Sequence, residues 1–144
     1  MVVVAVVAFA AAACGGGTSD DAASPSGDSG NETRGSATLL DAHAYADYLA
    51  EHPDVPVVNV HVPYEGHIEG TDVFVPFDEI GDWAGLPADK DAPLALYCRS
   101  GNMSATASDA LASLGYTDLV DLEGGMQAWT AAGYELLDDE SASR

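Results

Sequence analysis

Apolar and polar positions follow two different patterns along residues 38–138 of this chain. Short runs rich in valine and leucine are typical of strands that are buried on both faces of a sheet. Between them, apolar residues recur three and four positions apart, which is the spacing of an amphipathic helix. Strands that alternate with helices predict an α/β domain with a mainly parallel sheet. We expect strands at 55–60, 73–75, 94–97 and 119–122, helices at 41–51, 104–114 and 126–132, and one or two helical turns within 77–83.

The first 37 residues do not share these patterns. Residues 2–13 form an uninterrupted apolar run that ends in Ala11-Ala12-Ala13-Cys14. The run is shorter than the roughly 20 residues needed to span a bilayer, and its length suits an export signal. Small residues before a cysteine resemble the lipobox of bacterial lipoprotein signals, in which the cysteine becomes acylated. We therefore expect a signal peptide at 1–14 and a lipid anchor on Cys14, with an ordinary signal peptide as the alternative.

Domain boundaries follow from the composition on either side of the patterned region. Residues 15–37 are rich in Gly, Ser, Asp and Thr, which predicts a disordered polar tether. Residues 38–138 form the expected domain, and 139–144 an acidic tail. Such a chain would be exported and held at the outer face of the cell membrane, touching the membrane through the lipid anchor alone.

Charge and length narrow the classes of partner. The 144 residues suit one domain, which we expect to be monomeric, and the net charge is −20. An acidic surface repels phosphate backbones, so no nucleic acid is expected as a partner. This charge favours solubility, and a steering field for a cationic partner is the alternative. Four histidines without ligand spacing predict no metal site.

The most informative segment is a polar turn after the expected strand 94–97. It reads Cys98-Arg99-Ser100-Gly101-Asn102-Met103-Ser104 and leads into the expected helix 104–114. Ligands of open α/β sheets bind beyond the carboxyl ends of the strands. A thiol placed there faces backbone N–H groups and the positive end of a helix dipole, and both favour an anion. The turn predicts a reactive thiolate on Cys98, and a buried structural cysteine is the alternative.

Several segments resemble signatures of the rhodanese family. The turn 98–104 is similar to the family's active-site loop, and 111–116 to its Leu-x-x-Leu-Gly-Tyr motif. Residues 123–129 resemble Gly-Gly-x-x-Ala-Trp, and residues 57–61 and 66–70 resemble two upstream signatures. The resemblance covers about 38–137, which is essentially the whole expected domain.

The resemblance implies a mainly parallel five-stranded sheet with helices on both faces, and it implies sulfur chemistry. Cys98 would take sulfane sulfur from a small donor, hold it as a persulfide, and pass it to a thiol or a cyanide-like acceptor, without a cofactor. His61 and His67 would support the site. The loop that binds substrate and persulfide would comprise Arg99, Ser100, Gly101, Asn102, Met103 and Ser104.

Departures from the family pattern leave two other classes open. Asn59 and His61 stand where the family has Asp and Arg, and Met103 stands where a second arginine is common. These changes keep open a non-catalytic module that binds a thiol, a sulfur species or a partner protein. A cysteine phosphatase or arsenate reductase would need Cys-x5-Arg to hold an oxyanion, but Ser104 occupies the arginine position.

Overall fold

A single twisted sheet forms the centre of the computed structural model, which describes residues 32–34 and 36–138. Its strand order is β1-β2-β6-β5-β3-β4, and the five strands from β2 to β4 in this order are parallel. This arrangement confirms the expected five-stranded parallel sheet. The strands are β1 (Glu32–Arg34), β2 (Ala37–Leu40), β3 (Val57–Asn59), β4 (Val73–Phe74), β5 (Leu94–Tyr97) and β6 (Leu119–Leu122).

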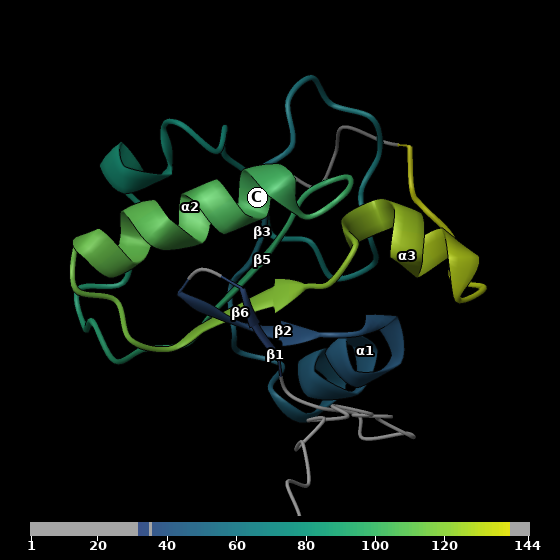
Figure 1. The fold of residues 1–144 in the computed structure, drawn as a ribbon, viewed down its shortest axis with the longest axis horizontal. Helices are drawn as coiled ribbons and strands as arrows, with labels where there is room; N and C mark the ends of the chain where they lie inside the picture. The colour runs from purple at the N-terminus through teal and green to yellow at the C-terminus, as the bar shows by residue number, and fades with distance from the viewer. Residues whose placement is uncertain (1–31, 35, 139–144) are drawn as a thin grey trace, which may run out of the picture.

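Helices cover both faces of the sheet, as expected. The elements are α1 (Ala42–Glu51), the 3-10 turn η1 (Ile80–Asp82), α2 (Asn102–Ser113) and α3 (Gly125–Ala131). Figure 1 shows α2 and α1 on opposite sides of the sheet. One apolar cluster joins the sheet to α2 and η1, and a second joins it to α1 and α3. Asp41 begins α1 as predicted, since its carboxylate accepts the N–H groups of His43 and Ala44 at 2.9 Å.

The central strand β5 is buried along its whole length because both of its faces are covered. Leu94 and Leu96 belong to the cluster under α2, whereas Ala95 and Tyr97 belong to the cluster under α1 and α3. Cys98 continues the alternation and lies with the α2 cluster. The strand therefore delivers Cys98 to the carboxyl end of the sheet, on the side where α2 begins.

At the amino-terminal edge of the sheet, the structure differs from the predicted tether. Glu32–Arg34, which we expected within the tether, pairs antiparallel with β2. Strand β2 was not predicted either, and it pairs with β6 from Thr38 to Leu40. Backbone hydrogen bonds to a distant strand hold both segments, and a local hydropathy pattern does not record such pairing. The other expectations for 1–31 and 139–144, including the lipid anchor on Cys14, lie outside the described residues.

Among residues 32–34 and 36–138, no helix combines the length and the apolar composition that crossing a membrane requires.

Candidate active site

The turn after β5 closes around the sulfur of Cys98. Gly101 has a φ of 94°, a left-handed conformation that favours glycine, and it caps the amino end of α2. Its N–H donates to Cys98 Sγ, with 3.0 Å between nitrogen and sulfur. Ser104 Oγ lies 3.5 Å from the same sulfur and 3.3 Å from the Gly101 carbonyl oxygen, so its single proton is shared between two acceptors.

Burial shapes what this sulfur can do. Cys98 is 1% exposed and Ser104 is fully buried, so water competes little for the donors that face the sulfur. The sulfur also lies at the amino end of α2, which spans 12 residues and presents a partial positive charge there. Hydrogen bonds and a helix dipole that converge on a buried sulfur stabilise an anion on it. The arrangement can therefore hold a thiolate or a persulfide anion.

The remaining residues of the turn line its rim. Ser100 and Asn102 are exposed, and Met103 is half-buried against the apolar cluster under α2. The Arg99 side chain is 53% exposed and its Nη1 lies 3.3 Å from Glu65 Oε2. The structure thus brings the predicted loop residues together, but the side chain of Arg99 is directed to an acidic partner.

Glu65 connects the turn to residues 59–61, which precede it in the sequence. Asn59 is buried, and its side chain donates to the Gly66 carbonyl and accepts the N–H of His61. His61 Nε2 lies 2.6 Å from Glu65 Oε2. A carboxylate only accepts hydrogen bonds, so this nitrogen carries the proton. Sequence reasoning missed Glu65; its spacing of four residues from His61 was the available signal, in a chain where acidic residues are abundant.

His67 lies in a different set of contacts from His61. It is 3% exposed, and its Nδ1 lies 2.9 Å from the Tyr64 hydroxyl. Its backbone forms an antiparallel bridge with Leu137, with hydrogen bonds of 2.9 and 2.8 Å. These contacts join the loop between β3 and β4 to the end of the domain.

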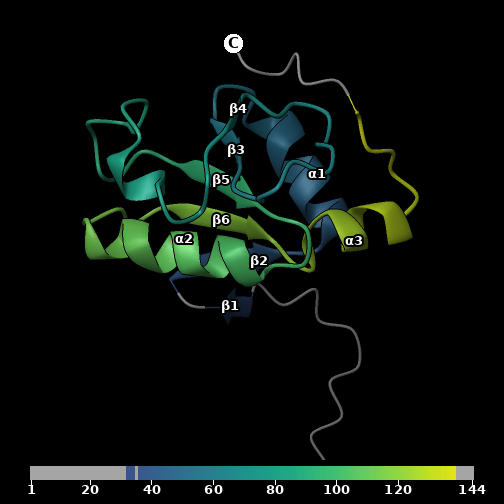
Figure 2. The same cartoon turned by 90° about the horizontal axis from the view of Figure 1, so that it is seen from above.

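Helix α3 holds the backbone of the turn from the other side. The N–H of Met126 donates to the Cys98 carbonyl at 2.9 Å, and the N–H of Gln127 donates to the Arg99 carbonyl at 3.0 Å. A Cβ on Gly125 would lie 2.2 Å from the Cys98 carbonyl oxygen, so only glycine fits there. Figure 2 shows this turn and the start of α3 side by side at one end of the sheet.

The pocket beside the turn is smaller than a pocket elsewhere on the domain. A pocket of about 190 Å³ adjoins the turn and includes Glu65 and Arg99 in its lining. A larger pocket of about 550 Å³ lies between α1 and residues 69–72, and none of its lining residues belongs to the turn. Within the part of the chain that the structure describes, no three His, Cys, Asp or Glu side chains group together to hold a metal ion. The turn itself presents Cys98 and its two hydrogen-bond donors, Gly101 and Ser104.

A family model agrees with this fold. Residues 28–132 match the model of the rhodanese-like domain. The chain belongs to the rhodanese-like domain family. The match begins before β1, so it includes the amino-terminal strands that the hydropathy pattern did not predict.

Two relatives of this rhodanese-like domain are named as sulfurtransferases. A probable adenylyltransferase/sulfurtransferase MoeZ of Mycobacterium tuberculosis is 32% identical over 108 residues, which are 71% of this chain and 26% of that protein. The thiosulfate sulfurtransferase GlpE of Pseudomonas fluorescens is 45% identical over 42 residues, which are 29% of this chain and 38% of that protein. The chain thus spans well under two thirds of either relative.

A solved structure supports the same fold. The rhodanese-related protein from Thermoplasma volcanium superimposes with a TM-score of 0.56 at 30% sequence identity, over 69% of this chain and 96% of that one.

Proposed function

We propose that this chain is a sulfurtransferase that carries sulfane sulfur as a persulfide on Cys98. The observation that carries the proposal is the convergence of the Gly101 N–H and the Ser104 hydroxyl on the cysteine sulfur at the start of α2. Membership of the rhodanese-like family and relatives named as sulfurtransferases support it. A persulfide anion needs the same donors as a thiolate, so one site serves both states.

The first half of the reaction loads the cysteine. The Cys98 thiolate attacks the outer sulfur of a donor such as thiosulfate, and a bond forms between Sγ and that sulfur. The sulfur–sulfur bond of the donor breaks, and its electron pair leaves with the remaining group, which is sulfite in this case. The donors from Gly101 and Ser104 hold the negative charge near the amino end of α2 before and after the attack.

The second half returns the thiolate. A nucleophile such as a thiolate or cyanide attacks the outer sulfur of the persulfide, and the electron pair of the broken bond returns to Sγ. Atoms and electrons balance without a redox cofactor. No second cysteine occurs within residues 32–34 and 36–138, so the acceptor must come from outside this domain.

The first test is a mass measurement on Cys98. Incubation with a sulfane donor is expected to add one sulfur atom to the peptide that contains Cys98, and cyanide is expected to remove it. Cys98→Ser should abolish both the adduct and the turnover, because serine is a poor nucleophile for sulfur. Cys14→Ser is the matched control and should load Cys98 as the wild type does. Undiminished transfer by Cys98→Ser would sink the proposal.

A non-catalytic module that binds a thiol, a sulfur species or a partner protein is the second candidate. The burial of Cys98 and the absence of charge on Met103 favour it. The same incubation separates the two functions. A module would react with an alkylating reagent but would take up no sulfur from any donor.

For location, we propose that the protein is exported and anchored by a lipid on Cys14. The support is the apolar run 2–13 and the three alanines that precede this cysteine. In cells, the mature protein is expected to begin at an acylated Cys14 and to sediment with membranes. Cys14→Ala should block processing or release the protein. A mature protein that keeps Met1 and remains in the cytoplasm would contradict this location.

A further inference from the structure

Positive charge is scarce where the sulfur reacts. The chain has four basic residues, and Arg99 is the only one in the turn. Lys90 precedes β5 and packs over the Tyr116 ring, with its Nζ 3.7 Å from the ring centroid, so it lies at the opposite end of the strand from Cys98. Any electrostatic attraction of an anionic reactant to Cys98 by a basic side chain of the turn therefore depends on Arg99.

That single cation already has a partner. Arg99 Nη1 lies 3.3 Å from Oε2 and 3.4 Å from Oε1 of Glu65. The carboxylate is itself held by the 2.6 Å contact with Nε2 of His61. The His61 side chain is 8% exposed, so it is a well-packed anchor for a carboxylate that is 41% exposed. Glu65 is thus positioned beside the turn and is not a freely moving surface acid.

We propose that Glu65 is a specificity-determining residue that neutralises Arg99 and makes the Cys98 site favour uncharged reaction partners over anionic ones. Charges act over about 8–10 Å at physiological salt, and Arg99 is the immediate neighbour of Cys98. With its charge compensated, the turn offers no net cation to a sulfonate or carboxylate group. As a statement about sulfur donors, the inference rests on the proposed function, and it names organic persulfides whose organic group carries no charge as the class preferred over thiosulfate.

Alkylation tests the charge preference without any sulfur transfer. Iodoacetate is anionic and iodoacetamide is neutral, and both alkylate the same thiolate. The full chain is used, and the mass of the peptide that contains Cys98 reports the label. Glu65→Gln is expected to raise the ratio of the iodoacetate rate to the iodoacetamide rate about fivefold, a modest factor because the Arg99–Glu65 pair is partly exposed. Glu65→Ala should change the ratio in the same direction, and the gain should shrink when Arg99→Gln is also present.

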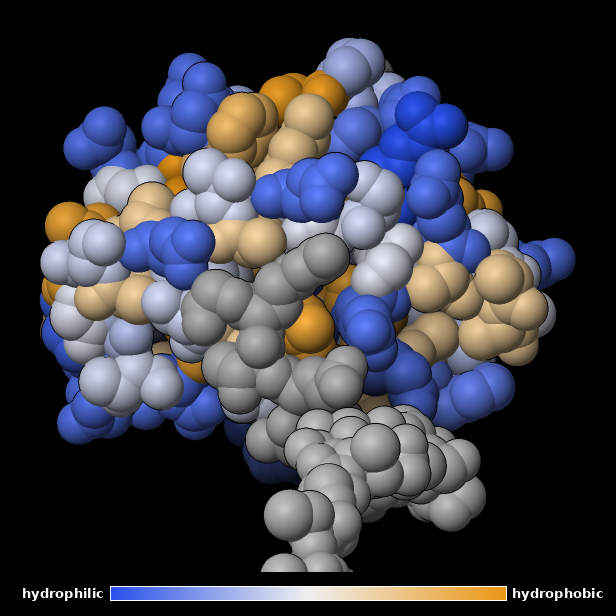
Figure 3. All heavy atoms as spheres, viewed as in Figure 1, coloured by the Kyte–Doolittle hydropathy of each residue, from blue (hydrophilic) through white to orange (hydrophobic). Residues whose placement is uncertain are grey.

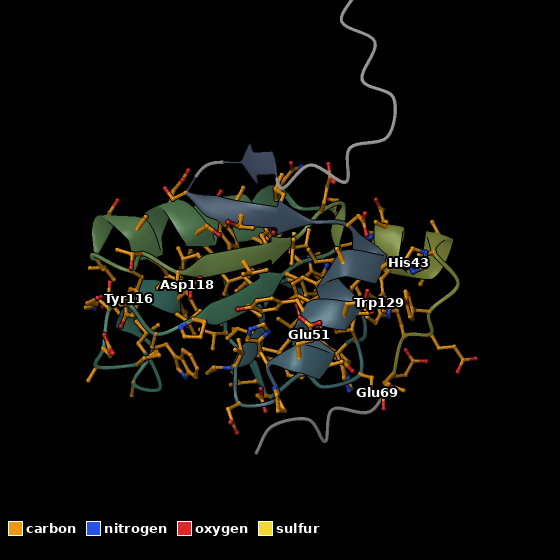
Figure 4. All side chains as sticks on the ribbon, turned by 90° about the horizontal axis from the view of Figure 1, so that it is seen from below. His43, Glu51, Glu69, Tyr116, Asp118 and Trp129 are labelled. Carbon is orange, nitrogen blue, oxygen red and sulfur yellow. The ribbon has the colours of Figure 1, made fainter. Side chains whose placement is uncertain are left out.

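Asp118→Asn is the matched control. It removes the same charge, but Asp118 is exposed and precedes β6, at the end of the sheet away from the turn; Figure 4 shows it beside Tyr116 and far from Trp129 of α3. This variant should keep the wild-type ratio. The inference is overturned if Glu65→Gln and Glu65→Ala keep the wild-type ratio, or if Asp118→Asn shifts it as much.

Sulfur donors then extend the test to the proposed reaction. The ratio of the thiosulfate loading rate to the loading rate from an organic persulfide with an uncharged organic group should rise in Glu65→Gln by a similar factor, whereas general damage to the site would lower both rates together. If Cys98 takes up sulfur from neither donor, the proposed sulfurtransferase is wrong, and the alkylation ratio still decides the role of Glu65.

Discussion

At the scale of single residues, the environment of the sulfur separates into two parts. Gly101 and Ser104 provide the hydrogen bonds that stabilise an anion, and they are buried with it. Arg99 and Glu65 set the charge at the exposed side of the turn. Met103 packs against the cluster under α2 and adds polarisable surface but no charge. In the proposed reaction, different residues would therefore stabilise the thiolate and recognise the donor.

Met103→Arg tests the contribution of charge in the turn. An added guanidinium beside the turn supplies a charge-assisted contact worth about 1.5–3 kcal/mol, so kcat/KM for thiosulfate should rise by roughly ten- to a hundredfold. The rate with a less charged donor, an organic persulfide with an uncharged organic group, should change much less. Steady-state kinetics with both donors measures the effect.

Ser113→Arg is the control for this variant, because it adds the same charge on an exposed residue at the far end of α2. Equal thiosulfate rates in wild type and Met103→Arg would mean that charge in the turn does not limit donor binding.

At the scale of elements, the active-site turn is held between two helices. Helix α2 caps it with Gly101, and α3 binds the carbonyl groups of Cys98 and Arg99 through two backbone N–H groups. The contact is close because Gly125 has no side chain. The conformation of the turn therefore depends on the docking of α3 as well as on its own sequence.

Gly125→Ala should separate α3 from the turn. The new Cβ would lie 2.2 Å from the Cys98 carbonyl oxygen, and φ at this residue is +59°. Backbone cannot move away cheaply, so we expect a loss of about 3 kcal/mol or more in the free energy of unfolding, with slower sulfur loading. Urea denaturation and the loading rate measure the two effects.

Gly133→Ala provides the comparison for this prediction. Its φ is +95°, yet a Cβ there would meet nothing within 4 Å, so backbone strain alone should cost about 1–2 kcal/mol. A similar small loss in both variants would show that the close approach at Gly125 is unimportant.

At the scale of the whole molecule, an acidic chain encloses a buried tyrosine whose pKa is raised. Figure 3 shows hydrophilic side chains spread over the visible face between smaller apolar areas, as expected for a chain with a net charge of −20. Inside, burial raises the pKa of Tyr97 from its ordinary value of 10.0 to about 12, although its hydrogen bonds with the Thr71 hydroxyl and the Ile68 N–H act in the opposite direction. Its hydroxyl lies 2.6 Å from Thr71 Oγ1.

Alkaline unfolding should therefore be steep in the wild type. The pKa of Tyr97 is higher in the folded protein than in the unfolded chain. Its contribution to the free energy of unfolding is therefore fully present below pH 10 and is lost as the pH rises to about 12. Tyr97→Phe should be less stable at pH 7 by about 1 kcal/mol, owing to the lost hydrogen bonds, but should lose less stability between pH 10 and 12. Urea denaturation across this range measures both effects, and parallel losses in the two proteins would contradict the assignment.

Much of this fold could be predicted from local patterns. Strands β5 and β6 have the predicted bounds, and α1 begins at the predicted cap, because apolar runs and capping residues act within a few positions of the chain. The turn that follows β5 could be singled out for the same reason, since a strand, a cysteine, a glycine and a helix stand next to one another in the sequence. These features also carried the family resemblance and the choice of Cys98.

Only the tertiary structure decided which distant residues meet at that cysteine. Strands β1 and β2 exist because their backbones pair with each other and with β6, which lies some 80 positions later along the chain. Likewise, Glu65 lies 34 residues before Arg99 in the sequence. Helix α3 contacts the turn through the backbone N–H groups of Met126 and Gln127. Hydrogen bonds, ion pairs and close approaches depend on distance in space. The amino-acid sequence by itself therefore singled out Cys98 as the candidate nucleophile, but not Glu65, the carboxylate that pairs with Arg99 beside it.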